Sequence, residues 1–358
     1  MQKIRILVVE DSLTVRRHLV DILSADPDID VIGEAADGKQ AIELCQALRP
    51  NVITMDMMLP VMSGLAATEF IMAHCPTPIL VVSASTNRGE LFKTYEALAA
   101  GAVDVLEKPT GDEPIGQWEG KFRAAVKMVS RIRVITHPRG KLAPVNPQVV
   151  PSASNRLRMP GAKPGCQVVA IGASTGGPGA IVSILRSLPM TSRLPIILVL
   201  HIGEPFGTAL ADWLDGQSER NVIQANDGNL VSHAVGRVVM APVGRHLIVR
   251  DGRFRLTQDP ERHSCRPSVD VLFESIALEY GSTATACLLT GMGKDGAQGL
   301  LKIRQAGGIT VAQDEATSVI FGMPHAAIEL GAATQILGLE DIVPFLLSLQ
   351  QIDARAMP

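Results

Sequence analysis

Two successive series of short apolar runs, separated by a proline-rich stretch, constrain most strongly how this chain can fold. The first series has five strand-like runs, at residues 4–9, 31–35, 52–55, 79–82 and 103–106. Helix-like stretches lie between them, such as residues 13–23, which follow a candidate N-cap at Ser12. This alternation predicts a five-stranded parallel sheet with helices on both faces, a doubly wound α/β domain.

A second alternating series begins at Cys166. A strand over residues 168–171 leads into a glycine-rich turn and then into a helix that starts at Pro178. Further strands are expected over residues 195–200 and 284–289, and a hairpin turn is expected at residues 250–253. The second series therefore predicts another α/β domain, with a mainly parallel sheet.

The distribution of charge supports this division of the 358 residues. The net charge is −9 over residues 1–119, +10 over residues 120–165 and −4 over residues 166–358, although the total is only −3. Residues 137–165 also hold six prolines, a composition that cannot build a core. We therefore expect a first domain over residues 1–125, a basic linker over 126–165 and a second domain over 166–350.

Several classes of protein are disfavoured. The basic segment has no aromatic residue after Phe122, so solubility and attraction to the acidic domain explain its charge better than nucleic-acid binding. The apolar stretches are too short for a signal peptide or a membrane span, so no direct membrane insertion is expected. The five cysteines are odd in number and form no Cys-x-x-Cys pair, which indicates buried, reduced thiols and a cytoplasmic location.

Polar residues end the strands of the first series. Glu10 and Asp11 follow the first strand, Asp56 the third, Ser83 the fourth and Lys108 the fifth. Because parallel strands end at one edge of the sheet, these side chains should converge. The three carboxylates suit a hard cation such as Mg²⁺, and Asp56 would then be the nucleophile that accepts a phosphoryl group. Any one of these five residues alone is more simply interpreted as an ordinary cap at a strand end. All five together, in this order at the strand ends, favour a functional site.

Residues 1 to about 125 resemble the receiver domains of two-component response regulators, which have a flavodoxin-like fold. The matching segments are Val8-Val9-Glu10-Asp11-Ser12, Met55-Asp56 with Pro60 and Gly64, Val82-Ser83-Ala84 and Glu107-Lys108-Pro109. The resemblance implies Mg²⁺ bound by Glu10, Asp11 and Asp56, and phosphorylation of Asp56 by a histidine kinase. Ser83 and Lys108 would be the residues that respond to phosphorylation.

The glycine-rich turn of the second series places Ser174 between a strand and a helix, in Gly172-Ala173-Ser174-Thr175-Gly176-Gly177. A Gly-x-Ser-x-Gly turn of this kind can present a nucleophilic hydroxyl at the helix N-terminus. The same turn could instead bind a phosphate through backbone N–H groups, or have only a structural role. The turn alone leaves all three interpretations open.

A nucleophilic serine needs a base and an orienting acid, and the second series offers both. His201 directly follows the strand over 196–200, so it should lie on the same sheet edge as Ser174. Asp295 lies in a glycine-rich segment, residues 289–296, just after another strand. The chain order Ser, His, Asp differs from that of ordinary α/β-hydrolases and argues against a common lipase or esterase.

Residues from about 168 to 346 resemble the catalytic domain of the chemotaxis protein-glutamate methylesterases, the CheB family. The matching segments are Ile171 to Gly177, Ala225-Asn226-Asp227-Gly228, Ala241-Pro242 with Gly244-Arg245-His246, Arg266-Pro267-Ser268-Val269-Asp270, Leu289 to Gly296, and Ala316-Thr317-Ser318 with Gly322-Met323-Pro324. A receiver joined by a linker to this domain is the architecture of that family.

This resemblance implies a catalytic triad of Ser174, His201 and Asp295, with Thr175 and Met292 at the oxyanion and substrate cleft. It implies hydrolysis of glutamate γ-methyl esters on the cytoplasmic domains of chemoreceptors, with release of methanol, and deamidation of receptor glutamines. The esterase would need no cofactor. It also implies that the receiver covers the catalytic cleft until Asp56 is phosphorylated. The residues that flank His201, Leu200 and Ile202, depart from the family pattern, so substrate fit could differ.

Three other functions are weaker. A DNA-binding output domain is disfavoured, because the second block is acidic and has no basic recognition helix. A non-catalytic scaffold that only relays phosphorylation is a second alternative, which labelling of Ser174 by an active-site phosphonate would argue against. A nucleotide-binding enzyme would use the glycine-rich turn, but Ser174 stands where the dinucleotide fingerprint has its second glycine.

Overall fold

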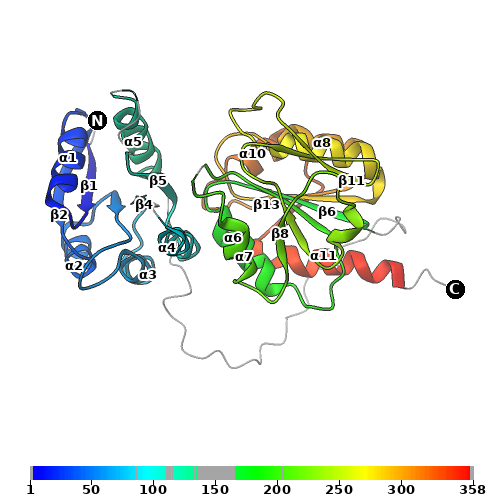
Figure 1. Ribbon diagram of the computed structural model, residues 1–358, viewed down its shortest axis with the longest axis horizontal. Coiled ribbons are helices and arrows are strands. Elements are labelled where there is room, and N and C mark those ends of the chain that lie inside the picture. The colour runs from blue at the N-terminus through cyan, green and yellow to red at the C-terminus, as the bar shows by residue number, and fades with distance from the viewer. Residues whose placement is uncertain are drawn as a thin grey trace.

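The computed structural model describes residues 3–84, 87–109, 114, 116–132, 134, 166–203 and 205–354, and shows two α/β domains side by side (Figure 1). Residues 137–165, which carry the six prolines, lie outside the described residues. Helix α5 (Gln117–Val129) ends inside the range expected for the linker. None of the helices in the described part of the chain is long and apolar enough to cross a bilayer.

The N-terminal domain is the predicted five-stranded parallel sheet, with strand order β2-β1-β3-β4-β5. Its strands are β1 (Ile4–Val9), β2 (Ile29–Ala35), β3 (Val52–Met55), β4 (Ile79–Ser83) and β5 (Asp104–Glu107). Helices α1 (Leu13–Ser24) and α5 cover one face, and α2 (Gly38–Leu48), α3 (Gly64–His74) and α4 (Arg88–Ala99) cover the other. The doubly wound prediction is confirmed.

Local sequence explains how this domain closes. The hydroxyl of Ser12 accepts a hydrogen bond from the backbone N–H of Val15 and caps α1, as the sequence predicts. Leu19 and Leu23 then lie on the buried side of α1, one turn apart, as an amphipathic helix requires. On the same sheet face, the rings of Trp118 and Phe122 stack at 5.0 Å between centroids.

The C-terminal domain has a seven-stranded parallel sheet, with strand order β14-β13-β12-β6-β7-β9-β8. Its strands are β6 (Val168–Ala173), β7 (Ile196–Leu200), β8 (Val222–Gln224), β9 (Val238–Met240), β12 (Ala284–Leu288), β13 (Ile309–Gln313) and β14 (Gln335–Leu337). A separate antiparallel hairpin joins β10 (His246–Arg250) to β11 (Arg253–Thr257) through the predicted turn. The mainly parallel sheet is therefore confirmed.

Helices cover both faces of this second sheet (Figure 1). One face is packed by α6 (Gly177–Ser187), α7 (Leu210–Asp215) and α11 (Leu339–Ala354), and the other by α8 (Val269–Tyr280), α9 (Ala297–Gln305) and α10 (Met323–Glu329). Strand β6 lies between β12 and β7, with Leu288 opposite Gly172 and Ala173 opposite Leu200. The carboxyl ends of these three strands therefore meet at one edge of the sheet, where parallel sheets usually carry their sites.

The two domains contact each other through α4, which packs against α6 and α7. Leu91, Tyr95 and Ala99 of α4 are buried in the same apolar cluster as one face of the second sheet. The Tyr95 hydroxyl donates a hydrogen bond to the carbonyl of Phe206, and the Tyr95 ring lies 5.4 Å from that of Trp213. The receiver-like domain is thus held against the second domain by specific buried contacts.

Candidate functional site

The acidic side chains of the first domain converge at the edge of the sheet, as predicted. One carboxylate oxygen from each of Glu10, Asp11 and Asp56 lies within 4.8 Å of the other two. Glu10 and Asp56 are buried, whereas Asp11 is exposed. Burial raises the pKa of Glu10 above its usual range, and the neighbouring Asp56 adds to this rise. A cation held among these carboxylates would relieve their mutual repulsion.

Lys108 and Ser83 complete this cluster. The Lys108 ammonium lies 2.7 Å from Glu10 Oε2 and 3.1 Å from Asp56 Oδ2. Burial opposes the charge of Lys108, but the two carboxylates outweigh it and raise its pKa. The buried Ser83 hydroxyl has no hydrogen-bond partner among the described residues. All-oxygen donors fit Mg²⁺, and an unpartnered hydroxyl beside an ammonium fits a phosphoryl group, so the residues suit both.

In the second domain, Ser174 lies in the turn between β6 and α6. Its backbone N–H donates to the Thr290 carbonyl at 3.0 Å, and its own carbonyl accepts from Gly177 N–H at 2.7 Å. Gly176 has φ of 77°, a left-handed conformation that favours glycine, and a Cβ there would lie 2.5 Å from Val319. The turn therefore depends on this glycine to hold Ser174 at the start of α6.

His201 follows β7 directly, as the sequence predicts, and its backbone N–H donates to the Ala173 carbonyl at 3.0 Å. Its side chain is largely buried, and Nε2 lies 2.9 Å from Asp295 Oδ2. Burial opposes the charge of the imidazole, but hydrogen bonds to Asp295 and Cys265 outweigh it and raise the pKa of His201 to about 9. The predicted base and acid are thus brought into direct contact.

Asp295 is buried in the loop between β12 and α9 and is fixed from several directions. Its carboxylate accepts hydrogen bonds from the Ser268 hydroxyl at 2.7 Å and from the backbone N–H groups of Val269 at 2.7 Å and Asp270 at 3.1 Å. Burial raises the pKa of Asp295, but its hydrogen bonds, first of all with His201, outweigh burial and lower it. The N-terminus of α8 therefore holds an ionised carboxylate against His201.

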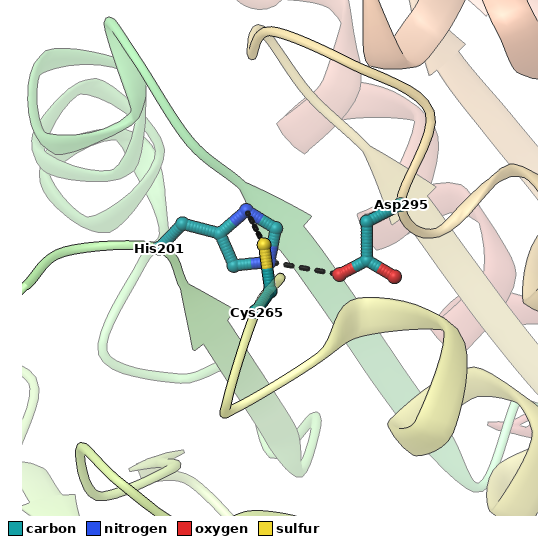
Figure 2. Close-up of side chains that lie close together, drawn as sticks. All are labelled: His201, Cys265 and Asp295. Atoms are coloured by element: carbon teal, nitrogen blue, oxygen red, sulfur yellow. Dashed lines mark hydrogen bonds and ion pairs between the residues drawn. The ribbon is translucent and has the colours of Figure 1, made fainter. Parts of the chain in front are cut away.

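Sequence reasoning did not assign a role to two residues beside this pair. Ser268 occurs in a segment that carried the family resemblance, and it both caps α8 and holds Asp295. Cys265 places its sulfur 3.8 Å from His201 Nδ1, so the two ring nitrogens face different partners (Figure 2). A search for metal-ligand or nucleophile spacing misses Cys265, because it is distant in sequence from His201.

The structure does not complete the predicted triad. Within the described part of the chain, the Ser174 hydroxyl makes no hydrogen bond to His201. Such contacts are often long in free enzymes and tighten when substrate binds.

Within the same described residues, the backbone N–H of Met292 has no hydrogen-bond partner, and the residue is well exposed. A free N–H at this loop suits an oxyanion donor.

A cavity of about 740 Å³ lies between the two domains, beside Ser174 and His201. Ser174, Thr175, His201, Ile202 and Cys265 line it from the second domain. The first domain lines it with residues from β5 and α5, namely Leu106, Glu107, Trp118 and Lys121. The sequence departure at Leu200 lies in the core, because that side chain is buried, whereas the departure at Ile202 lies in the cavity wall.

Comparison with known proteins gives two matches of family models. Residues 169–346 match the CheB methylesterase family, and residues 6–117 match the response regulator receiver domain. A protein-glutamate methylesterase/protein-glutamine glutaminase from Anaeromyxobacter dehalogenans is 41% identical over 339 residues, which cover 95% of each chain. One from Nitrosospira multiformis is 41% identical over 355 residues, which cover 97% of each.

A solved structure is also similar to part of the chain. The catalytic domain of the Thermotoga maritima CheB methylesterase is 38% identical, with a TM-score of 0.49, and the match covers 51% of this chain and 98% of that one.

Proposed function

The chain belongs to the family of protein-glutamate methylesterases/protein-glutamine glutaminases, and we propose that Ser174, His201 and Asp295 perform its chemistry. The enzyme hydrolyses glutamate γ-methyl esters on chemoreceptors, releases methanol and deamidates receptor glutamines. Its receiver domain makes it a response regulator in chemosensory adaptation. The observation that carries the assignment is the His201–Asp295 pair. His201 follows β7 and Asp295 lies in the loop after β12, and these two strands flank β6, which leads into the Ser174 turn.

The proposed reaction begins with attack of Ser174 Oγ on the ester carbonyl. Asp295 accepts a hydrogen bond from Nε2 of His201, so Nε2 keeps its proton and Nδ1 is the basic nitrogen. His201 takes the serine proton at Nδ1 and returns it to the departing methanol. Water then hydrolyses the acyl-enzyme, with His201 again as the base. An acyl-enzyme formed from a receptor glutamine side chain is hydrolysed in the same way.

The oxyanion of each tetrahedral intermediate needs donors in a fixed place. We propose the backbone N–H groups of Thr175 and Met292, which border the Ser174 turn and the Asp295 loop. One such donor contributes about 3 kcal/mol in comparable sites. The esterase chemistry uses only these side chains and backbone groups, so no cofactor is part of the proposal for this domain.

For the receiver domain we propose that Asp56 accepts a phosphoryl group from a histidine kinase, the phosphodonor that the receiver match implies. Glu10, Asp11 and Asp56 would hold Mg²⁺, which neutralises phosphoryl oxygens when bound. Lys108 lies 3.1 Å from the Asp56 carboxylate and would face the same phosphoryl oxygens, and the unpartnered Ser83 would offer the hydroxyl that responds to phosphorylation. The methylated substrates are cytoplasmic domains of chemoreceptors, so we place the protein in the cytoplasm and propose no nucleic acid as partner.

For the domain boundaries we propose a receiver over residues 1–125, a linker over 126–165 and a catalytic domain over 166–350. We also propose that the receiver covers the catalytic cavity until Asp56 is phosphorylated. Two observations support this: residues of β5 and α5 line the cavity that contains Ser174, and α4 packs against α6 and α7. Phosphorylation would shift the population toward an open arrangement.

The decisive experiment measures methanol release from a methylated receptor preparation. Ser174→Ala should abolish methanol release while the same protein still incorporates phosphate at Asp56. An active-site phosphonate should label Ser174 in the native chain and leave the variant unlabelled. Release of methanol by Ser174→Ala at the native rate would show that another residue is the nucleophile.

A further inference from the structure

Cys265 forms a second contact with the proposed catalytic base. Its sulfur lies 3.8 Å from His201 Nδ1, while His201 Nε2 lies 2.9 Å from Asp295 (Figure 2). The imidazole therefore connects a thiol on one nitrogen to a carboxylate on the other. A thiol, an imidazole and a carboxylate in this order are the groups that activate the nucleophile of thiol hydrolases.

The hydrogen bonds around Asp295 decide which nitrogen of His201 carries the proton. The carboxylate is held ionised by Ser268 and by the N-terminus of α8, so it accepts from Nε2–H and leaves the lone pair of Nδ1 toward the thiol. The geometry thus provides the Cys265 thiol with a base.

The backbone holds the thiol in this place. Arg262 and Cys265 pair across a tight turn, with N–H to carbonyl distances of 3.2 and 2.9 Å. The two residues between them, His263 and Ser264, have φ of 53° and 59°, which is the left-handed region that side chains other than glycine rarely adopt. The sulfur also lies 3.4 Å from the His263 carbonyl, which is a second possible acceptor for its one proton. Cys265 is therefore positioned by a defined turn.

The thiol is also accessible. Cys265 is half-buried and lines the cavity of about 740 Å³ that contains Ser174 and His201. Three cysteines, Cys45, Cys75 and Cys287, are buried as the sequence predicts, and burial raises the pKa of Cys75 to about 12. The expectation of buried thiols is wrong for Cys265 and Cys166, which are half-buried, and of these two only Cys265 lines the cavity. A partly exposed thiol beside an imidazole is the environment in which cysteines react with oxidants.

We propose that Cys265 is a peroxide-sensitive modification site whose oxidation stops the esterase. The inference rests on the proposed role of His201 as the base. His201 Nδ1 accepts the thiol proton, and the sulfur attacks one oxygen of a hydroperoxide. The S–O bond forms as the O–O bond breaks, and the leaving oxygen takes the proton from His201. The thiol is oxidised to a sulfenic acid, and the hydroperoxide is reduced to water or an alcohol.

The product blocks the base by its position. The new oxygen is attached to the sulfur that lies 3.8 Å from Nδ1, so it stands beside that nitrogen on the side where Ser174 must deliver its proton. There the sulfenic hydroxyl can hydrogen-bond to Nδ1, and Ser174 loses the group that should take its proton. A thiol reductant reverses the change, because sulfenic acids are reduced back to thiols.

The test treats the full chain with hydrogen peroxide and then measures methanol release and labelling by dimedone, which traps sulfenic acids. The variants are Cys265→Ser and Cys265→Ala, and the matched control is Cys166→Ser, which removes the other half-buried thiol. Each rate is divided by the untreated rate of the same variant, so any effect on basal turnover cancels. Peptide mass spectrometry locates the dimedone.

We expect peroxide to lower the rate of the native chain and of Cys166→Ser about 100-fold, the low end of what a general base contributes. Dithiothreitol should restore both rates, the two Cys265 variants should resist, and dimedone should lie on Cys265. Absence of dimedone from Cys265 in the native chain would overturn the proposal. An equal loss of the rate of methanol release in the Cys265 variants would also overturn it. This holds if dithiothreitol restores the rate, and it holds if dithiothreitol does not, as expected for oxidation of the exposed Met292.

The two proposals fail in distinguishable ways. If the untreated, reduced chain releases no methanol, the proposed esterase function is wrong, and dimedone labelling still decides whether Cys265 reacts with peroxide. If the reduced chain releases methanol and peroxide leaves its rate unchanged, the esterase stands and the proposed site at Cys265 is wrong.

Discussion

The imidazole of His201 and the carboxylate of Asp295 lie 2.9 Å apart, and the N-terminus of α8 fixes the carboxylate. This arrangement assigns the proton of the neutral ring to Nε2 and directs the basic lone pair of Nδ1 into the cavity. The orientation of one ring therefore governs both the proposed esterase and the proposed sensitivity of Cys265 to peroxide.

Asp295→Asn should leave the fold intact and lower the rate of methanol release about 10⁴-fold, as the loss of an orienting carboxylate does in serine proteases. The amide can donate to Nε2, which would then lose its proton and leave Nδ1 protonated and unable to accept from Ser174. Steady-state methanol release measures the effect, and circular dichroism checks the fold. A loss of less than tenfold would contradict the assigned role of Asp295.

Ser268→Ala should lower the free energy of unfolding by about 1–2 kcal/mol, because the hydroxyl both caps α8 and donates to the buried Asp295. Ser268→Thr keeps the hydroxyl and should recover most of the loss. Urea denaturation of both variants measures the difference. Equal stability of Ser268→Ala and the native chain would show that the cap and the hydrogen bond contribute nothing.

The pKa of His201, raised to about 9 from an ordinary 6.5, predicts a dependence of stability on pH. The folded state binds this proton more tightly than the unfolded state, so the stabilisation is complete below about 6.5 and disappears as pH rises to about 9. The difference in unfolding free energy between the native chain and His201→Gln should therefore shrink over that interval. Denaturation at a series of pH values checks this, and a constant or growing difference would refute it.

Strand ends were predictable from the sequence because each apolar run is followed by a polar residue at its carboxyl end. This placed Glu10, Asp56, Ser83 and Lys108 at one edge, and placed His201 beside the Ser174 turn. The parallel sheets followed from the alternation of strands and helices. The short strands β8, β9 and β14 had too few residues to show a pattern.

The contacts of Ser268 and Cys265 could not be predicted in the same way. Cys265 reaches His201 across 64 positions, through a turn whose left-handed residues are His263 and Ser264 rather than the usual Asn-Gly. Ser268 carries an ordinary N-cap signal, but nothing local shows that its hydroxyl faces Asp295. Both contacts depend on how loops meet above the sheet, which residue patterns do not encode.

Asp56→Asn should prevent phosphate incorporation from a phosphorylated histidine kinase and abolish the increase in esterase rate that phosphorylation causes. The amide lacks the nucleophilic carboxylate that faces Lys108 at 3.1 Å. Asp30→Asn, an exposed position on β2, is the matched control and should behave like the native chain. Phosphate incorporation into Asp56→Asn at the native level would place the acceptor elsewhere.

Tyr95→Phe should raise the esterase rate of the unphosphorylated chain by up to about fivefold, because it removes only the hydrogen bond to the Phe206 carbonyl. One such bond contributes about 1 kcal/mol, which changes an open-to-closed ratio by roughly that factor. Tyr280→Phe, on α8, is the control and should leave the rate unchanged. Residues 166–358 expressed alone should be faster still, because the receiver contacts are then absent. Rates equal to the native rate in both cases would mean that the receiver does not inhibit the esterase by covering its cavity.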